Sequence, residues 1–284
     1  MRRKKQMKRE IEVEFDDLEW LYSPNWEYFD YGNCKRHLQV ILPYRRKGLG
    51  KKYPVIFYIP GAAWHKQEMY NDLPKLAELA KKGFAIVSIE VRESDAAVFP
   101  AQIEDVKNAM DCVVRKISEF DLPFDANRFY LMGHSSGGHL AMMAVLYNAC
   151  GRIKMPDVKG VILESASSNL LICANQPLPP GLSDRPAAVL LGVDSIENNK
   201  EIAYGASCES LIREDIILPP VLMFHCANDP VVSVVNSRSL YQKLEENKHS
   251  VEYYEIKEWE EHGGNIYFSE TVLSIIDGFI KGTQ

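Results

Sequence analysis

A regular alternation of short apolar segments with longer amphipathic ones does most to restrict how this chain of 284 residues folds. Residues 53–60 read YPVIFYIP, a nearly continuous run of β-branched and aromatic side chains. Such a run is typical of a strand buried on both faces of a parallel sheet. Residues 102–120 instead place apolar side chains at every third or fourth position, which predicts one apolar stripe on a helix. Strands and helices in alternation predict an α/β fold with a mostly parallel central sheet flanked by helices.

The same alternation continues to the C-terminal end of the chain. One stretch departs from it, because residues 165–218 are rich in Pro, Ser, Asn and Gly and show no clear period. This connection is longer than an ordinary link between a strand and a helix, so we expect a small cap-like insertion over the functional site. Residues 1–284 as a whole are expected to form a single domain. Strands are predicted at 34–43, 53–60, 84–91, 128–132, 158–163, 220–226 and 251–256, and helices at 72–82, 102–120, 137–147, 236–246 and 265–280.

Charge and hydropathy argue against two classes of partner. The net charge is -6 and the pI is about 5.7, so the chain offers no broad basic surface for nucleic acid. Basic residues are concentrated in an N-terminal arm, residues 1–10, which we interpret as a solvated terminus. The apolar stretch of a signal peptide does not follow the arm, and no apolar run approaches the roughly 18 residues of a membrane span. These features predict a cytoplasmic protein that binds neither nucleic acid nor a membrane.

The six cysteines are widely dispersed along the chain. They form no CxxC pair and no cluster with histidine at the spacing of a structural zinc site. We therefore expect reduced thiols, no bound metal and no cofactor. The sequence leaves open whether the protein is a homodimer.

Residues 128–140 read RFYLMGHSSGGHL, a short apolar strand followed by a tight turn and a helix. The turn contains Gly133, Ser135 and Gly137 in the GxSxG spacing of a nucleophile elbow. Glycine is needed on both sides of the serine because flanking Cβ atoms would collide with neighbouring backbone. The helix also directs unpaired N–H groups and a partial positive charge towards a group that reacts at the serine. Ser135 is therefore the candidate nucleophile.

A serine hydroxyl needs a histidine to accept its proton and a carboxylate to hold that histidine in one tautomer. In a fold of this type the acid follows a late strand and the histidine lies in a later loop. Asp229 follows the apolar segment PPVLMFHC, and His262 lies in the segment EWEEHGGN before the last helix. We therefore predict Asp229 as the acid and His262 as the general base. The competing titratable groups are interpreted as packing, pocket-wall or solvated side chains: His134, His139, His225, His249, Asp194, Glu197 and Asp215.

The negative charge that develops on a reacting carbonyl oxygen must be stabilised by N–H groups. One is expected from Ser136, the residue after the nucleophile, and another from the loop that follows residues 55–59. That loop reads PGAAW from position 60, and its small side chains allow the backbone to approach the oxyanion. Ala62, Ala63 and Ser136 are therefore the candidate donors.

Five separated motifs occur in a fixed order along the chain: IPGAAW, VFPAQIEDVKNAM, GHSSGGHLA, PPVLMFHCANDPVV and EHGG. Together they resemble the esterase and lipase branch of the α/β-hydrolases with HGGxW oxyanion loops, which includes acetyl-xylan and feruloyl esterases. The resemblance runs from about Cys34 to the C-terminus and implies the α/β-hydrolase fold. It also implies a triad of Ser135, Asp229 and His262, with Ala62 and Ser136 as donors to the oxyanion.

Two positions depart from the pattern of that branch. Pro60 stands where histidine is usual, and Ala62 stands where glycine is usual. We expect these residues to restrict the backbone of the oxyanion loop, which argues against bulky acyl groups and tertiary alcohols as substrates. Pro100 and Asp105 match a structural part of the pattern and are given no catalytic role.

The leading hypothesis is a carboxylesterase that hydrolyses short-chain acyl esters, such as acetyl or feruloyl esters of plant carbohydrate, through an acyl-enzyme. Its partner would be a small-molecule ester. An arylformamidase, a prolyl-oligopeptidase-like peptidase and a catalytically inactive ligand-binding protein are the alternatives. Trp64 and His134 are the predicted substrate-binding residues, and His65 and residues 170–182 are expected to line the pocket.

Overall fold

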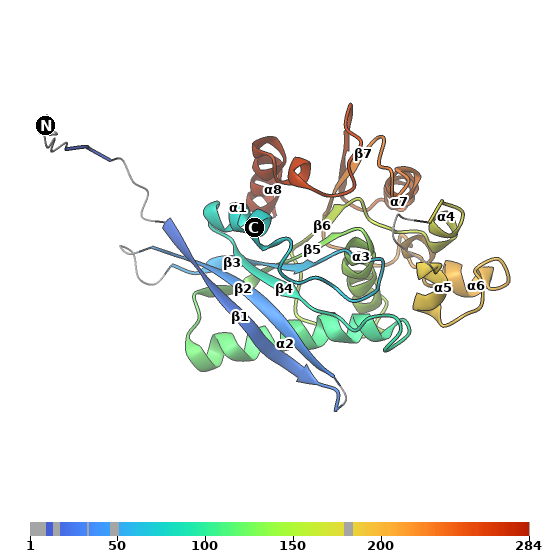
Figure 1. Ribbon diagram of the computed structural model, residues 1–284, viewed down its shortest axis with the longest axis horizontal. Coiled ribbons are helices and arrows are strands. Elements are labelled where there is room, and N and C mark those ends of the chain that lie inside the picture. Colours follow the sequence, from blue (N-terminus) through green and yellow to red (C-terminus); the bar gives the residue numbers. More distant parts are fainter. Residues whose placement is uncertain (1–9, 14–17, 33, 46–50, 179–183, 284) are drawn as a thin grey trace, which may run out of the picture.

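An eight-stranded sheet runs through the structure, a computed structural model that describes residues 10–13, 18–32, 34–45, 51–178 and 184–283 (Figure 1). The strands are β1 (Leu18–Asp30), β2 (Lys35–Arg45), β3 (Tyr53–Ile59), β4 (Ala85–Ile89), β5 (Phe124–His134), β6 (Gly160–Glu164), β7 (Val221–Cys226) and β8 (Val251–Ile256). Their order is β1-β2-β4-β3-β5-β6-β7-β8, and each neighbouring pair from β4 to β8 is parallel. β2 pairs antiparallel with both β1 and β4. The predicted α/β fold around a mostly parallel sheet is confirmed.

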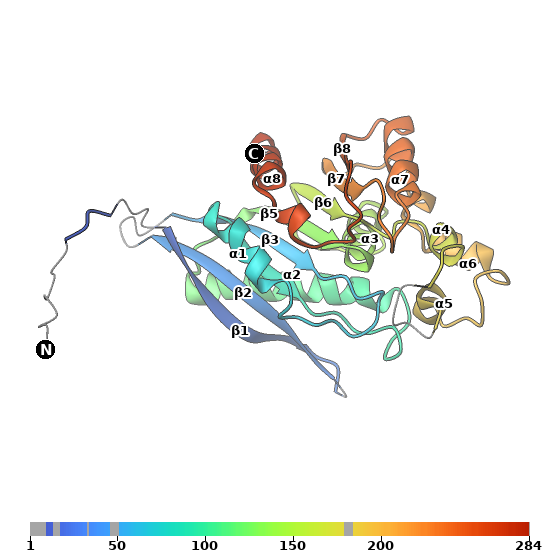
Figure 2. The same ribbon diagram turned by 45° about the horizontal axis from the view of Figure 1, so that its top comes forward.

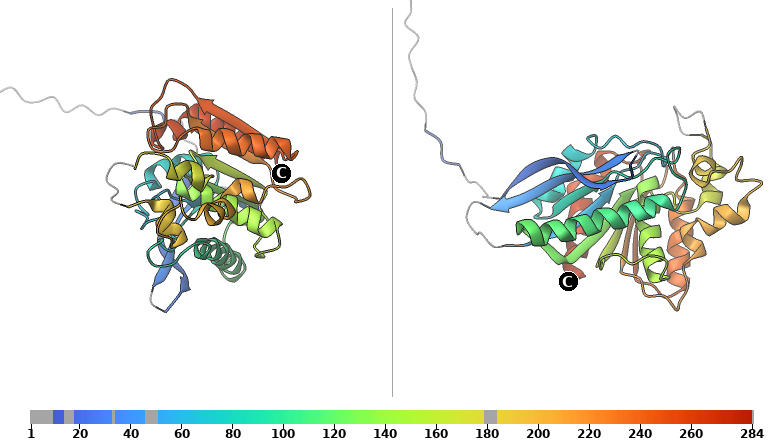
Figure 3. Two further views of the ribbon diagram at one scale, coloured as in Figure 1. Left: turned by 90° about the vertical axis from the view of Figure 1, so that its right-hand side faces the viewer. Right: turned by 90° about the horizontal axis from the view of Figure 1, so that it is seen from below.

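Each face of the sheet packs against its own set of helices. The main helices are α1 (Leu73–Lys81), α2 (Ala101–Phe120), α3 (Ser136–Ala149), α7 (Val235–Glu246) and α8 (Glu270–Gly282). On β3, Val55, Phe57 and Ile59 lie in the core shared with α2, α3 and α7, whereas Ile56 and Tyr58 lie in the core shared with α1 and α8. Figures 2 and 3 show α1 and α8 on one side of the sheet and α2 and α3 on the other. Because successive side chains of a strand point to opposite faces, β3 must be apolar at every position.

The predicted cap-like insertion, residues 165–218, connects β6 to β7 and forms short helical elements where the structure describes it. These elements are α4 (Leu170–Ala174), α5 (Pro186–Leu191), α6 (Lys200–Gly205) and the 3-10 turn η1 (Cys208–Ser210). Figure 1 shows them gathered beside α3 and α7 at one end of the molecule. Helices of this length are too short to produce a visible period in the sequence, which explains why the segment looked irregular.

One strand of the sheet, β1, was not predicted. It forms an edge of the sheet, and its Trp20, Leu21 and Tyr22 side chains are exposed. Two register shifts interrupt its pairing with β2. An edge strand that is half exposed and irregular shows neither a continuous apolar run nor strict alternation, so periodicity does not reveal it.

The last predicted helix begins later than expected. Residues Asn265–Phe268 form the 3-10 turn η2, and the regular helix α8 starts at Glu270. The Ser269 hydroxyl caps α8 by accepting a hydrogen bond from the Val272 N–H. The capping serine therefore sets the helix start, although the apolar spacing extends further towards the N-terminus.

The predicted basic arm, residues 1–10, lies outside the described residues except for Glu10. Within the part of the chain that the structure describes, no helix is both long enough and apolar enough to cross a membrane.

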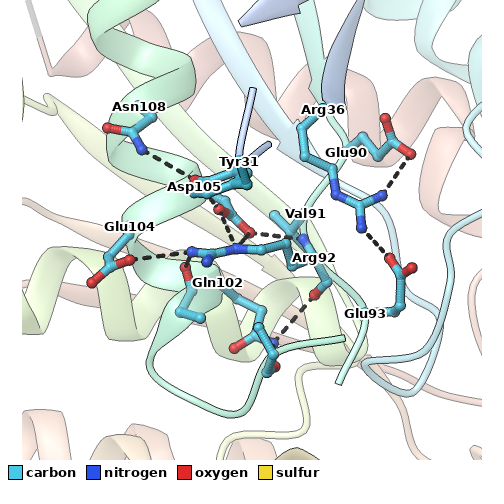
Figure 4. Close-up of polar contacts among 12 residues, drawn as sticks. Tyr31, Arg36, Glu90, Val91, Arg92, Glu93, Gln102, Glu104, Asp105 and Asn108 are labelled. Carbon is cyan, nitrogen blue, oxygen red and sulfur yellow. Dashed lines mark hydrogen bonds and ion pairs between the residues drawn. The ribbon is translucent and has the colours of Figure 1, made fainter. Parts of the chain in front are cut away.

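Asp105 is fully buried on α2 and joins three segments that are distant in sequence (Figure 4). Its carboxylate accepts hydrogen bonds from the Arg92 N–H (2.7 Å), the Arg92 Nε (2.9 Å) and the Tyr31 hydroxyl. The Arg92 guanidinium also lies 3.9 Å from the centre of the Tyr31 ring. In the same loop, the Ser94 N–H donates to the Trp64 carbonyl (2.8 Å), so the network supports the loop predicted to bind the oxyanion.

Replacing Asp105 with alanine is expected to lower the free energy of unfolding by about 3–5 kcal/mol, because the largely buried Arg92 charge would lose its buried partner and keep only the exposed Glu104 carboxylate. Asp111→Ala on the same helix is the matched control, since Asp111 forms a more exposed ion pair with Lys107. The control should change stability by less than about 1 kcal/mol. Urea unfolding followed by circular dichroism measures both variants, and equal midpoints would show that the buried network adds no stability.

Candidate active site

Ser135 lies in the turn between β5 and α3, with backbone angles φ 55° and ψ -122°. A residue other than glycine in this region of backbone space costs roughly 1–3 kcal/mol, so surrounding contacts must hold it there. The Ser135 N–H donates to the Glu164 carbonyl (2.8 Å), and the Ser167 N–H donates to the Ser135 carbonyl (3.1 Å). Backbone bonds to the end of β6 thus hold the candidate nucleophile in its strained conformation.

The two glycines of the GxSxG motif are required by close approach of backbone atoms. A Cβ atom on Gly133 would overlap the carbonyl oxygen of Gly137. A Cβ atom on Gly137 would overlap the carbonyl of Ile59 at the end of β3. This arrangement agrees with the steric reason that the sequence suggested for the motif.

The structure brings the three predicted triad side chains together. His262, in the loop between β8 and η2, places its Nε2 2.9 Å from the Ser135 Oγ and its Nδ1 2.8 Å from the Asp229 Oδ2. An ionised carboxylate only accepts hydrogen bonds, so Nδ1 carries the proton and Nε2 is free to accept the serine proton. This tautomer is the one that a general base at His262 requires.

Asp229, in the loop after β7, is fully buried and accepts several hydrogen bonds. Its Oδ1 accepts from the N–H groups of Val231 (2.8 Å) and Val232 (2.9 Å), and the His225 Nε2 lies 3.3 Å from its Oδ2. Burial alone would raise the pKa of Asp229, but hydrogen bonds from His225, His262 and the Val232 N–H lower it well below its ordinary value. The acid therefore stays ionised at neutral pH. The contact with His225 was missed, because the sequence suggested only a packing role.

His134 does not lie where a substrate-binding role requires. It borders a polar cavity on the far side of His262, and it is not among the residues around the apolar cavity at Ser135. Its ring lies against that of His262, with the ring centres 4.7 Å apart. Burial and the neighbouring His262 lower the pKa of His134 to about 3, so its imidazole is neutral at pH 7. We therefore correct the prediction for His134, which packs behind the candidate base.

His139 holds the Trp64 side chain in place. The Trp64 Nε1 donates to the His139 Nδ1 (3.1 Å), and the His139 Nε2 donates to the Ala206 carbonyl (2.8 Å). Burial lowers the pKa of His139 to about 4, so the ring is neutral and can accept at Nδ1. Trp64 lines the cavity at Ser135, which agrees with its predicted place at the substrate site.

The three candidate oxyanion donors differ in whether the N–H group already has an acceptor. The Ala62 N–H already donates to the Ser136 Oγ (3.0 Å). Among the hydrogen bonds of the described residues, the Ala63 N–H has no acceptor, and the Ser136 N–H lies in the first turn of α3, where helical partners are missing. The structure therefore favours Ala63 and Ser136 as donors and gives Ala62 a supporting place beside them.

Ala62 does not have the positive φ that would require glycine. The residues of this loop with positive φ are Ala63 (49°) and Trp64 (59°). The buried Gln67 side chain holds the loop by donating to the Pro60 carbonyl (2.9 Å) and accepting from a backbone N–H after β4 (2.8 Å). The residues of this loop under backbone strain are therefore Ala63 and Trp64.

A small cavity of about 70 Å³ opens beside Ser135. Residues from 173 to 178 contribute to its wall, which agrees in part with the predicted stretch 170–182, whereas 179–182 lie outside the described residues. His65 is not among the residues that line this cavity. Its Nε2 instead contacts the Asp184 carboxylate (3.1 Å). The apolar lining includes Ala63, Trp64, Leu178, Ile196, Val231 and Val232.

The sheet topology and the serine, histidine and aspartate at its strand ends define the α/β-hydrolase class. The chain belongs to the BD-FAE family, whose family model matches residues 38–244. The resemblance to α/β-hydrolase esterases that the motifs suggested is therefore confirmed.

Curated relatives carry esterase names. Esterase LipC of Mycobacterium tuberculosis is 25% identical over 219 residues, which cover 72% of this chain and 52% of that protein. Isoprenylcysteine alpha-carbonyl methylesterase ICME of Arabidopsis thaliana is 24% identical over 230 residues, covering 76% of this chain and 51% of that protein. The chain thus spans about half the length of these relatives.

A solved structure agrees with the fold. The truncated form of a carbohydrate esterase from gut microbiota superimposes with a TM-score of 0.77 at 24% sequence identity, covering 92% of this chain and 96% of that chain. At this identity the likeness establishes the shared α/β-hydrolase fold.

Gly137→Ala is expected to lower the free energy of unfolding by more than about 4 kcal/mol, because the added methyl group would overlap backbone that cannot move aside. Gly278→Ala is the matched control, since a Cβ at this exposed site on α8 meets open space. The control should stabilise the protein by up to about 1 kcal/mol. Thermal unfolding compares the two variants, and a wild-type melting temperature for Gly137→Ala would contradict the steric argument.

Proposed function

We propose that the protein is a serine carboxylesterase that hydrolyses short-chain acyl esters through an acyl-enzyme intermediate. The observation that carries the proposal is the hydrogen-bonded chain from Ser135 through His262 to Asp229 beside a small apolar cavity. A nucleophile, a base and an orienting acid in this order are what acyl transfer requires. The esterase names of LipC and ICME support the same class of reaction.

In the proposed mechanism, the Ser135 Oγ attacks the ester carbonyl carbon while its proton passes to the His262 Nε2. The carbonyl oxygen becomes an oxyanion, which the N–H groups of Ala63 and Ser136 stabilise. His262 then gives its proton to the alcohol oxygen, the carbon–oxygen bond breaks, and the acyl group stays on Ser135. A water molecule attacks this acyl-enzyme with His262 again as base, which releases the carboxylic acid and restores the serine.

The cavity at Ser135 supports a short acyl group. Its volume of about 70 Å³ and its apolar wall suit a small acyl chain better than a long one. For the alcohol side, the name of the carbohydrate esterase neighbour supports a carbohydrate. Of the predicted substrates, an acetyl ester fits the small cavity better than the larger feruloyl ester. The proposed partner is accordingly a small-molecule ester.

Ser135→Ala is expected to lower the rate of p-nitrophenyl acetate hydrolysis by roughly 10³-fold or more and to abolish labelling by a fluorophosphonate, because both reactions need the serine oxygen. Ser274→Ala, at an exposed position on α8, is the control and should keep both signals. Acetylated xylan and methyl ferulate are tested alongside. A folded wild-type protein that hydrolyses no ester would contradict the proposal, and hydrolysis of a formyl anilide alone would favour an arylformamidase.

Ile196→Ala is expected to shift the preference towards longer acyl chains, because Ile196 is buried in the wall of the cavity. The ratio of kcat/KM for p-nitrophenyl hexanoate to that for acetate should rise about tenfold, in line with the usual effect of a few methylene groups. Ile202→Ala is the control, since Ile202 is exposed on α6. An unchanged ratio in Ile196→Ala would mean that the acyl group binds elsewhere.

A further inference from the structure

Two histidines contact the same carboxylate oxygen. The His262 Nδ1 lies 2.8 Å from the Asp229 Oδ2, and the His225 Nε2 lies 3.3 Å from that oxygen. The His225 and Asp229 side chains are both 0% exposed. His225 is next to the last residue of β7, four positions before Asp229, so the strand itself fixes where its ring lies. Only one of the two histidines reaches the nucleophile, which leaves the second without a place in the proposed mechanism.

The neighbours of His225 determine where its proton lies. Its Nε2 is 2.9 Å from the Val232 carbonyl as well as 3.3 Å from Asp229. A carbonyl and a carboxylate both accept, so Nε2 must carry the hydrogen and share it between them. Nδ1 is then an acceptor, and the Ser237 hydroxyl, 2.7 Å away in the first turn of α7, donates to it. The two acceptors at Nε2 therefore fix the tautomer of His225, and the Ser237 hydroxyl supplies the hydrogen bond that its Nδ1 accepts.

We propose that His225, held by Ser237, is a positioning residue that keeps Asp229 oriented towards His262 during the reaction. The inference rests on the proposed esterase function. In that mechanism His262 gains and loses a proton in each cycle, so its own hydrogen bond to Asp229 changes in strength. The Val231 and Val232 N–H groups hold Oδ1, and the N–H of His225 is a donor to Oδ2 that stays constant through the cycle.

The His225 N–H also disperses part of the negative charge on Asp229. Without this donor, more charge would face His262 and its protonated form would be stabilised. His262 must be neutral to accept the serine proton, so the acidic limb of the kcat/KM profile would move to higher pH. The ionisable groups around Asp229 are His225 and Cys226 on β7, His262 in the loop after β8, and His134 at the end of β5. Lys75 of α1 lies beyond His134.

The test compares three variants with the wild type. His225→Leu removes all three contacts of the ring, with Asp229, the Val232 carbonyl and Ser237. His225→Gln keeps an N–H near the position of Nε2. Ser237→Ala keeps the imidazole but removes the hydroxyl that donates to its Nδ1. His249→Leu is the matched control, because His249 is only partly buried and its Nε2 contacts the Arg213 carbonyl (3.0 Å), which belongs to no part of the triad. The pH profile of p-nitrophenyl acetate hydrolysis is measured for each, with active sites counted by fluorophosphonate labelling.

The expected result for His225→Leu is a kcat per labelled site that falls roughly tenfold to hundredfold, the usual effect of losing an outer partner of a catalytic group. The acidic limb of its pH profile should move to higher pH, and Ser237→Ala should show a smaller shift in the same direction. His225→Gln should restore most of the kcat per labelled site and most of the wild-type position of the acidic limb. A purely structural role would lower the number of labelled sites and leave the limb in place.

The proposal is overturned if neither His225→Leu nor Ser237→Ala moves the acidic limb, or if His225→Gln is as impaired as His225→Leu. When His225→Leu fails to fold, the comparison of Ser237→Ala with His225→Gln decides the question. Failure of the esterase function itself would look different, because the wild type would then neither hydrolyse p-nitrophenyl acetate nor react with the fluorophosphonate.

Discussion

The close approach of α3 to the end of β3 is the constraint on which the site depends. Gly137 lies so near the Ile59 carbonyl that no side chain fits between them. This contact makes the turn before α3 tight enough to hold Ser135 at the ends of β3 and β5. It also brings Ser136 beside the oxyanion loop, where its hydroxyl accepts from the Ala62 N–H. One packing contact therefore fixes the nucleophile and the candidate oxyanion donors together.

Burial keeps two histidines near Ser135 uncharged. The pKa of His134 falls to about 3 and that of His139 to about 4, so both rings are neutral at pH 7 and serve as packing or hydrogen-bonding groups. Asp229 holds a negative charge because hydrogen-bond donors offset the cost of its burial. The proposed proton transfer can therefore run between Ser135 and His262 without a second cation beside the reacting atoms.

Sequence patterns predicted what repeats along the chain and missed what depends on contacts between distant segments. The parallel strands and the turn at Ser135 have local signatures, an apolar run and a glycine spacing, and both were predicted. The edge strand β1 has no such signature because one face is exposed. The contact of His225 with Asp229 and the hydrogen bond that Trp64 donates to His139 arise only when strands and loops pack together. The positive φ angles of the oxyanion loop likewise follow from tertiary contacts.

The helix that carries the candidate nucleophile also limits the size of the cavity at Ser135. His139 lies one turn after Ser135 on α3, and its two ring nitrogens join Trp64 of the oxyanion loop to the Ala206 carbonyl of the cap-like insertion. Because the ring is buried and neutral, neither bond is exchanged for water at ordinary pH. Trp64 thus cannot turn aside to admit a larger group without breaking a buried hydrogen bond. The proposed preference for short acyl chains would thus follow from the same helix that positions Ser135, and would not require a separate closing motion of the insertion.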